Sequence, residues 1–246
     1  MSKISKILVS QPEPHPRSHY FTIAEKHKLK IEFVPFIEIV SVTNKEFRKQ
    51  RVDLNTFPAV IFTSRNSMDF YFKMMEEMRA TISQETKYFC VSEAIALYLQ
   101  KYIQYRKRKV FFSNGNFEDF KRLIKKHKNT GKFLVPCTDI RNDELANYLS
   151  QEEFNYTESV MYRAVNADLS EMAINDYDMI VFFSPTGVQS LLDNFPKYKQ
   201  GNTLIAAYGS TTHEKIEELG LRLDLQAPTE QHRSMSMVIE SYFDRN

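Results

Sequence analysis

Short runs of β-branched and aromatic residues alternate along this chain of 246 residues with segments of helical periodicity. Most runs are separated by roughly 10 to 15 residues whose apolar positions recur every three or four residues. Alternation of this kind predicts βαβ units, parallel sheets and helices on both faces of each sheet. The predicted strands are residues 6–10, 31–40, 59–63, 87–91, 109–112, 132–136, 156–165, 178–183, 203–207 and 222–226.

The number of predicted strands indicates two domains, because domains usually contain about 100 to 150 residues and one doubly wound sheet rarely needs so many strands. Two long segments, "KIEFVPFIEIVSV" and "YTESVMYRAVNADL", alternate apolar and polar residues, which is typical of strands with one solvated face. If they pair, they form a two-stranded linker near residues 34–42 and 158–166. Residues 1–37 and 167–246 would then form one α/β domain, and residues 40–163 an inserted second domain.

Two stretches share one pattern in which a strand end leads directly into a helix start. They are "IFTSRNSMDFYF" and "VFFSPTGVQSLL", and their serines, Ser64 and Ser184, coincide when the stretches are aligned. Apolar residues follow each serine at the spacing of an amphipathic helix. Serine is a preferred N-cap, and Pro185 suits the first helical position. Further predicted N-caps are Ser92, Asn116, Asn142 and Thr211, the last with capping-box spacing to Glu214.

In a parallel sheet these helix starts all lie at the carboxyl edge, where ligand crevices form. Each start presents unpaired backbone N–H groups and the positive end of a helix dipole, so several together predict a surface that binds anions. Two such domains facing each other would enclose a cleft suited to a polyanion. Gly187 and Gly209 fall within these junctions and would let a ligand approach the backbone. The competing interpretation is that each cap only starts its helix.

Composition argues against several other classes of function. The six glycines are fewer than the roughly 17 of average usage, and the sequence contains neither G-x-G-x-x-G nor a P-loop, which argues against a nucleotide phosphate cradle. Cys90 and Cys137 share no metal-ligand spacing with each other or with histidine, so we expect core thiols and no metal. The chain lacks the roughly 18-residue apolar run of a membrane helix, and its apolar N-terminal run is too short for a signal peptide. We therefore expect a cytoplasmic protein with no membrane partner.

A basic run, Arg106 to Lys109, stands outside this pattern. The net charge is only +2, and neither a helix-turn-helix nor an RNP-like pattern accompanies the run, so we expect no nucleic-acid partner. The run is then a solvated loop, or it attracts an acidic substrate. Salt-dependent DNA binding is the alternative.

Taken in order, the motifs resemble those of the uroporphyrinogen-III synthase family, and the resemblance covers essentially the whole chain. It implies two flavodoxin-like or Rossmann-like parallel-sheet domains joined by a two-stranded β-ladder linker, with the N-terminal and C-terminal segments together making one domain. The segments that carry the resemblance are "AVIFTSRNSMDFYF", "YFCVSEAIALYL", "KFLVPCTDIRNDELANYL", "YTESVMYRAV", "VFFSPTGVQSLL", "IAAYGSTTHEKIEELGLRL" and "APTEQHRSM".

The resemblance also implies an activity, the cyclisation of hydroxymethylbilane, a linear tetrapyrrole with eight carboxylates, to uroporphyrinogen III. Water is lost and ring D is inverted. No cofactor is implied, and we expect a monomer acting on this small molecule. Within "SVMYRAV", Tyr162 matches the family's candidate for the acid that helps the hydroxyl leave, since a phenol with a pKa of about 10 is a donor at neutral pH. The alternative for Tyr162 is packing of its ring on the strand. The implied substrate contacts are Thr63, Ser64, Ser92, Ser184, Thr186, Gly187, Ser210, Thr211 and Thr212.

The sequence departs from the family pattern at two positions. Ile95 stands where many members have threonine, which removes a hydroxyl contact. Ser210 stands where proline is common, a change that the backbone should tolerate. A second hypothesis therefore stays open, that of a non-catalytic, two-domain protein that binds a tetrapyrrole or another polyanion.

Overall fold

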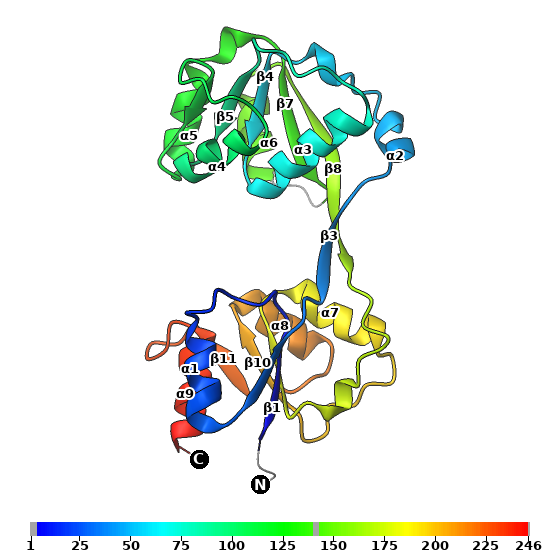
Figure 1. The fold of residues 1–246 in the computed structure, drawn as a ribbon, viewed down its shortest axis with the longest axis vertical. Helices are drawn as coiled ribbons and strands as arrows, with labels where there is room; N and C mark the ends of the chain where they lie inside the picture. The colour runs from blue at the N-terminus through cyan, green and yellow to red at the C-terminus, as the bar shows by residue number, and fades with distance from the viewer. Residues whose placement is uncertain (1–3, 140–142, 246) are drawn as a thin grey trace. The chain divides into compact units, whose positions relative to one another are not determined.

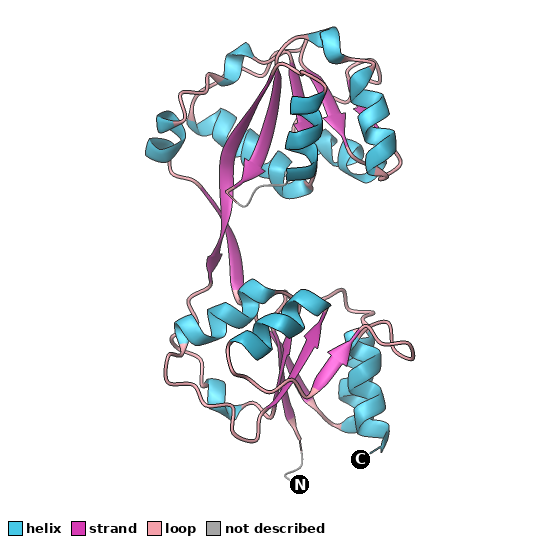
Figure 2. Ribbon diagram, turned by 180° about the vertical axis from the view of Figure 1, so that it is seen from behind, coloured by secondary structure: helices cyan, strands magenta, loops and turns pink. Residues whose placement is uncertain are grey.

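The computed structural model describes residues 4–139 and 143–245. The chain divides into two compact units, one made of residues 1–38 and 165–246 (unit 1) and the other of residues 39–164 (unit 2). Each unit is a sheet covered by helices on both faces, as Figure 1 shows by element and Figure 2 by secondary structure. The predicted fold class, α/β with parallel sheets, is confirmed.

The sheet of unit 1 has the strand order β11-β10-β9-β1-β2, and all of its neighbouring pairs are parallel. The N-terminal and C-terminal segments meet at its centre, where Val9 on β1 lies opposite Val181 on β9. The strands are β1 (Lys6–Val9), β2 (Lys30–Phe33), β9 (Met179–Phe182), β10 (Leu204–Tyr208) and β11 (Leu225–Ala227).

Side chains of the unit 1 strands alternate between the two faces of the sheet. Ile180 and Ile205 belong to one core cluster with residues of helices α7 (Pro185–Asn194) and α8 (Ser210–Glu218). Met179 and Ala206 belong to a second cluster on the other face, with residues of α1 (His19–His27) and α9 (Met235–Arg245). Burial on both faces explains why these strands read as continuous apolar runs in the sequence.

The sheet of unit 2 has the order β3-β8-β7-β4-β5-β6, and the pairs from β8 to β6 are parallel. Both β3 and β8 cross the boundary between the units, and the Val42 amide donates to the Met161 carbonyl beside their pairing (3.0 Å). The strands are β3 (Ile37–Ser41), β4 (Ala59–Phe62), β5 (Lys87–Cys90), β6 (Val110–Phe112), β7 (Phe133–Thr138) and β8 (Tyr156–Asn166).

Helices cover both faces of the unit 2 sheet in the same manner. Val60 and Tyr88 pack with residues of α2 (Asn44–Lys49), α3 (Arg65–Glu77) and α4 (Glu93–Tyr98). Ile61 and Phe89 pack on the opposite face with α5 (Phe117–Lys125) and α6 (Asp143–Gln151). Short 3-10 turns lie at Leu54–Thr56, Leu99–Lys101, Lys128–Thr130 and Ile174–Asp176.

The prediction of one strand over residues 31–40 is wrong. The structure has two strands there, β2 in the sheet of unit 1 and β3 in that of unit 2, separated by residues 34–36. Pro35 has no N–H to donate to a sheet ladder. Phe36 is fully buried in the unit 1 core, and its carbonyl accepts from the Ser190 hydroxyl (2.7 Å) and the Ala167 amide (3.0 Å). The chain is therefore anchored between the two strands.

Most predicted helix caps are confirmed. The side chains of Ser64, Ser92, Ser184 and Asn116 each accept a hydrogen bond from a backbone N–H in the first turn of the following helix. The assignment of Thr211 is wrong, because α8 begins at Ser210 with Gly209 as its N-cap. Gly209 has φ 88° and ψ 141°, a conformation that only glycine adopts without strain. Asn142 lies outside the described residues.

Gly209→Ala should lower the free energy of unfolding of unit 1 by roughly 1 to 3 kcal/mol through backbone strain alone. An added Cβ would meet no atom within 4 Å, so packing does not contribute. Urea unfolding followed by circular dichroism measures the effect. The matched control is Ser210→Ala, at the next and exposed position, which should change stability by less than about 0.5 kcal/mol. Equal stability of the two variants would contradict the strain argument.

Candidate functional site

The carboxyl edge of the unit 2 sheet gathers several of the predicted site residues. Thr63 and Ser64 follow β4, and Ser92 follows β5. Tyr162 lies on β8 opposite Thr138, the last residue of β7. Because β8, β7, β4 and β5 run parallel, their carboxyl ends meet at the same edge. Ser64 and Tyr162, far apart in sequence, come close enough for the Ser64 side chain to affect the pKa of the Tyr162 phenol.

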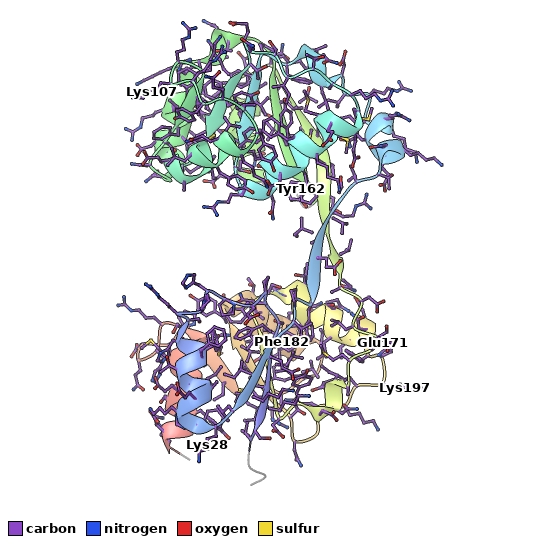
Figure 3. The ribbon with its side chains drawn as sticks, in the orientation of Figure 1. Lys28, Lys107, Tyr162, Glu171, Phe182 and Lys197 are labelled. Carbon is purple, nitrogen blue, oxygen red and sulfur yellow. The ribbon has the colours of Figure 1, made fainter. Side chains whose placement is uncertain are left out.

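The environment of Tyr162 keeps its phenol protonated. The side chain is 8% exposed, and its ring stacks on Phe70 of α3 with 5.0 Å between ring centroids. Figure 3 shows Tyr162 projecting from β8 beside α3. Burial raises the pKa of the phenol above its ordinary value of 10.0, while the nearby Ser64 side chain acts in the opposite direction. Tyr162 therefore combines the ring packing that its strand pattern predicted with a neutral hydroxyl that can donate.

The helix starts that follow β4 and β5 differ in their fitness for anions. Ser64 caps α3 by accepting from the Ser67 amide (3.0 Å), and Arg65 occupies the first position of the helix. Ser92 caps α4 by accepting from the Ile95 amide (3.4 Å), but the first helical residue there is Glu93. A carboxylate at that position repels a second one, so the α3 start suits an anionic ligand better. Ile95, which stands where many family members have threonine, packs against the core and offers no hydroxyl at the α4 start. This agrees with the lower suitability of that helix start for an anion.

The carboxyl edge of the unit 1 sheet holds the other predicted residues. Ser184 caps α7 by accepting from the Gly187 amide (3.1 Å), and its hydroxyl lies 3.1 Å from that of exposed Thr186. Gly187 is buried, and an added Cβ would come within 3.3 Å of the Ser184 hydroxyl and 3.8 Å of the Ser10 hydroxyl. The missing side chain of Gly187 thus makes room for neighbouring protein atoms, and its amide is occupied by the cap.

The α8 start is more open. Its N-cap, Gly209, has no side chain to occupy the amides of the first turn, and the space beside its Cα is empty to 4 Å. Ser210 and Thr211 are exposed, whereas Thr212 is 1% exposed and belongs to the packed side of the helix. Free amides at the positive end of a helix dipole favour an anion. Among the predicted starts, α8 therefore offers the most accessible backbone donors.

Two further groups lie at these edges and were missed from the sequence. The Arg65 guanidinium lies 5.2 Å from the centroid of the Tyr98 ring, whose hydroxyl donates to Asp69 (2.8 Å). In unit 1, exposed His15 and Arg17 lie in the loop that follows β1. The sequence signal for Arg65 was a cation directly after a capping serine. The loop after β1 has no comparable signal for His15 and Arg17, because its prolines interrupt any periodic pattern.

Neither a metal centre nor a membrane span is found among residues 4–139 and 143–245. In those ranges, His, Cys, Asp and Glu form no group of three that could hold a metal ion, and no helix is long and apolar enough to cross a membrane. Cys90 is a core residue, and burial raises the pKa of its thiol to about 12.

Comparisons with known proteins place this geometry in context. The family model described as uroporphyrinogen-III synthase HemD matches residues 18–237. A uroporphyrinogen-III synthetase from Helicobacter pylori is structurally similar, with a TM-score of 0.60, 16% identity, and coverage of 99% of this chain and 100% of that one. A mutant uroporphyrinogen III synthase from Thermus thermophilus gives a TM-score of 0.50, 13% identity and 97% coverage of both chains. A comparison with curated protein sequences finds no significant match.

Ser64→Ala should raise the pKa of Tyr162 further above 10, because the Ser64 side chain is what opposes the effect of burial. The measurement is an NMR titration of protein labelled with tyrosine at the ζ carbon, with the Tyr162 signal assigned by its loss in Tyr162→Phe. Ser92→Ala, which removes another cap at the same edge, should leave the titration of Tyr162 unchanged. A fall in the pKa on Ser64→Ala would contradict this effect of Ser64 on the phenol.

Proposed function

The chain belongs to the uroporphyrinogen-III synthase family of cyclising lyases in heme biosynthesis, and we propose that its substrate is hydroxymethylbilane. The observation that carries the proposal is the family match over residues 18–237 together with the Tyr162–Ser64 pair at a carboxyl edge. We further propose that units 1 and 2 act as the two domains predicted from residues 1–37 with 167–246 and from residues 40–163.

In this proposal Tyr162 donates its proton to the terminal hydroxyl of the substrate. The C–O bond breaks, water leaves, and the electron pair of the terminal pyrrole stabilises the electrophilic carbon that remains. The substituted carbon of ring D attacks that carbon and forms a spirocyclic intermediate, whose rearrangement inverts the ring and closes the macrocycle. A neutral, buried phenol suits the first step, because a general acid must hold its proton at working pH.

Most of the catalytic task is conformational, because the electrophile also closes without an enzyme to the wrong isomer. The protein has to hold the linear chain so that the substituted carbon lies nearest the electrophile, and it has to exclude water. Such positioning depends more on fixed hydrogen-bond donors to the substrate carboxylates than on reactive side chains. This is consistent with a site in which the notable features are helix starts and one phenol.

We assign carboxylate binding to helix starts in both units, with the α3 and α8 starts as the main contributors. Arg65 adds a cation at the first, and the uncapped amides after Gly209 serve at the second. Buried Gly187 and Thr212 would act by shaping their helix starts. The side chains proposed to contact substrate are Thr63, Ser64, Ser92, Ser184, Thr186, Ser210 and Thr211. We propose action as a cytoplasmic monomer without cofactor or nucleic-acid partner.

The identity of the product tests the proposal. Purified protein is supplied with hydroxymethylbilane, and the products are oxidised and separated as isomers. We expect isomer III, formed faster than the uncatalysed isomer I. Isomer I alone at the uncatalysed rate would leave only the non-catalytic binding hypothesis.

Tyr162→Phe should lower kcat by roughly 100-fold, at the lower end of the usual contribution of a general acid because this electrophile forms readily. Phenylalanine keeps the stacking on Phe70, so circular dichroism and thermal unfolding should be nearly unchanged. Tyr156→Phe is the matched control, because Tyr156 lies at the start of the same strand and its hydroxyl bonds Ser150 (2.7 Å). Equal turnover of wild type and Tyr162→Phe would remove Tyr162 from the chemistry.

Arg65→Gln should raise KM about tenfold while leaving kcat within about twofold, because a charge-assisted hydrogen bond to a substrate carboxylate is replaced by a neutral one. Lys73→Gln, an exposed cation further along α3, is the control and should leave both constants unchanged. Initial rates of isomer III formation over a range of substrate concentrations separate the two constants. A fall in kcat with constant KM would contradict a role in binding.

A further inference from the structure

A cavity of about 250 Å³ lies at the opposite edge of the unit 2 sheet from the proposed catalytic residues. Two of its lining residues immediately precede strands, Thr86 before β5 and Lys109 before β6. Since those strands are parallel, this amino edge is opposite the carboxyl edge where Ser92 follows β5. We call it the amino-edge cavity. It is a separate site within the same unit.

Apolar side chains form much of the wall of the amino-edge cavity. Ile82 is 40% exposed, and Ile103 and Val110 continue the lining. The Tyr102 ring also lines the cavity, and it is held in place by stacking on Phe72 with 4.3 Å between centroids. Fixed aromatic and aliphatic walls around a small volume favour the binding of a flat apolar group such as an aromatic ring.

Two cations of the basic run lie on the wall of the same cavity. The Arg106 guanidinium donates to the neutral side chain of Gln84 (3.1 Å), so this contact leaves its charge uncompensated. Lys109 donates to Glu85 (2.6 Å), whose side chain is 82% exposed and therefore well hydrated. The positive charge of Lys109, Arg108 and Arg106 holds the pKa of Glu85 below its ordinary value, Lys109 having the largest effect. The wall thus has a net positive charge, and the Arg106 guanidinium keeps N–H donors that its contact with Gln84 does not use.

A buried phenol supplies the second polar feature. Tyr88 lines the cavity and is 2% exposed, and its hydroxyl has no hydrogen-bond partner among the residues that the structure describes. The Thr86 side chain lowers the pKa of the Tyr88 phenol, but the positions of the two groups do not satisfy the geometry of a hydrogen bond. Buried polar atoms are nearly always paired in folded proteins. The hydroxyl is therefore free to bond a group that enters the cavity, as far as the described residues go.

We propose that the amino-edge cavity binds a small aromatic carboxylate, with its ring between Ile82, Ile103 and Tyr102 and its carboxylate on Arg106. Arginine presents a planar pair of donors that matches a carboxylate. The Tyr88 hydroxyl supplies a further hydrogen bond at the inner end. The proposal does not depend on the cyclisation chemistry, and it gives part of the basic run a role in binding.

The test uses 2-naphthoate as the probe and the full-length protein with isotope-labelled isoleucine methyl groups. The Ile82 and Ile103 signals are assigned with Ile82→Val and Ile103→Val. We expect saturable ring-current shifts of these two methyls with a Kd below about 1 mM. The neutral analogue 2-naphthamide should bind about tenfold more weakly, because it lacks the charge that Arg106 recognises. Absence of saturable shifts up to about 10 mM 2-naphthoate would overturn the proposal.

Paired variants separate this site from general attraction to a basic surface. Arg106→Gln should weaken 2-naphthoate about tenfold, whereas Arg108→Gln, in the same run but outside the lining, should change the Kd by less than about twofold. Tyr88→Phe should weaken binding about threefold while keeping the ring in the core. Equal losses for the two arginine variants, or shifts only at methyls outside the cavity, would overturn the assignment. Circular dichroism confirms that each variant is folded.

Discussion

Parallel strand pairing is the constraint on which the rest of this structure depends. It requires a crossover connection, usually a helix, between consecutive parallel strands, and it places the carboxyl ends of these strands at a common edge. Ser64 after β4 and Tyr162 on β8 meet because both strands take part in one parallel array with β7 between them. The proximity of two side chains so distant in sequence is thus a product of topology. The local sequence only had to supply a capping serine and a strand tyrosine.

A network around Asp69 stabilises the region between the two edges of unit 2. Its carboxylate accepts from the Tyr98 and Tyr102 hydroxyls and from the Lys101 ammonium. Burial raises the pKa of Asp69, but these hydrogen bonds outweigh it and hold the pKa below its ordinary value. The network fixes the Tyr98 ring under Arg65 and the Tyr102 ring in the wall of the amino-edge cavity. One carboxylate on α3 therefore orders groups that face both edges.

Local patterns predicted what local forces determine. The strands buried on both faces and the caps at Ser64, Ser92 and Ser184 follow from residues within one turn or one strand. The break at Pro35 was missed because the apolar–polar alternation continues on both sides of it, and the anchoring of Phe36 depends on the distant Ser190. The space beside Gly187 is limited likewise by Ser10, and the amino-edge cavity is lined by residues from two separate loops and from β5 and β6. Such contacts are set by tertiary packing, which no short pattern encodes.

The interior position of β1 in the unit 1 sheet affects how the chain folds during synthesis. Ile7 pairs with Met179, so the first strand has no partner on that side until the ribosome has synthesised nearly three quarters of the chain. Residues 39–164 are contiguous and include most of the unit 2 sheet, so we expect unit 2 to fold first during synthesis. Until β9 emerges, β1 and β2 expose apolar faces and an open sheet edge, which favours wrong association. We therefore expect the nascent N-terminal segment to stay exposed to wrong association longer than the strands of unit 2.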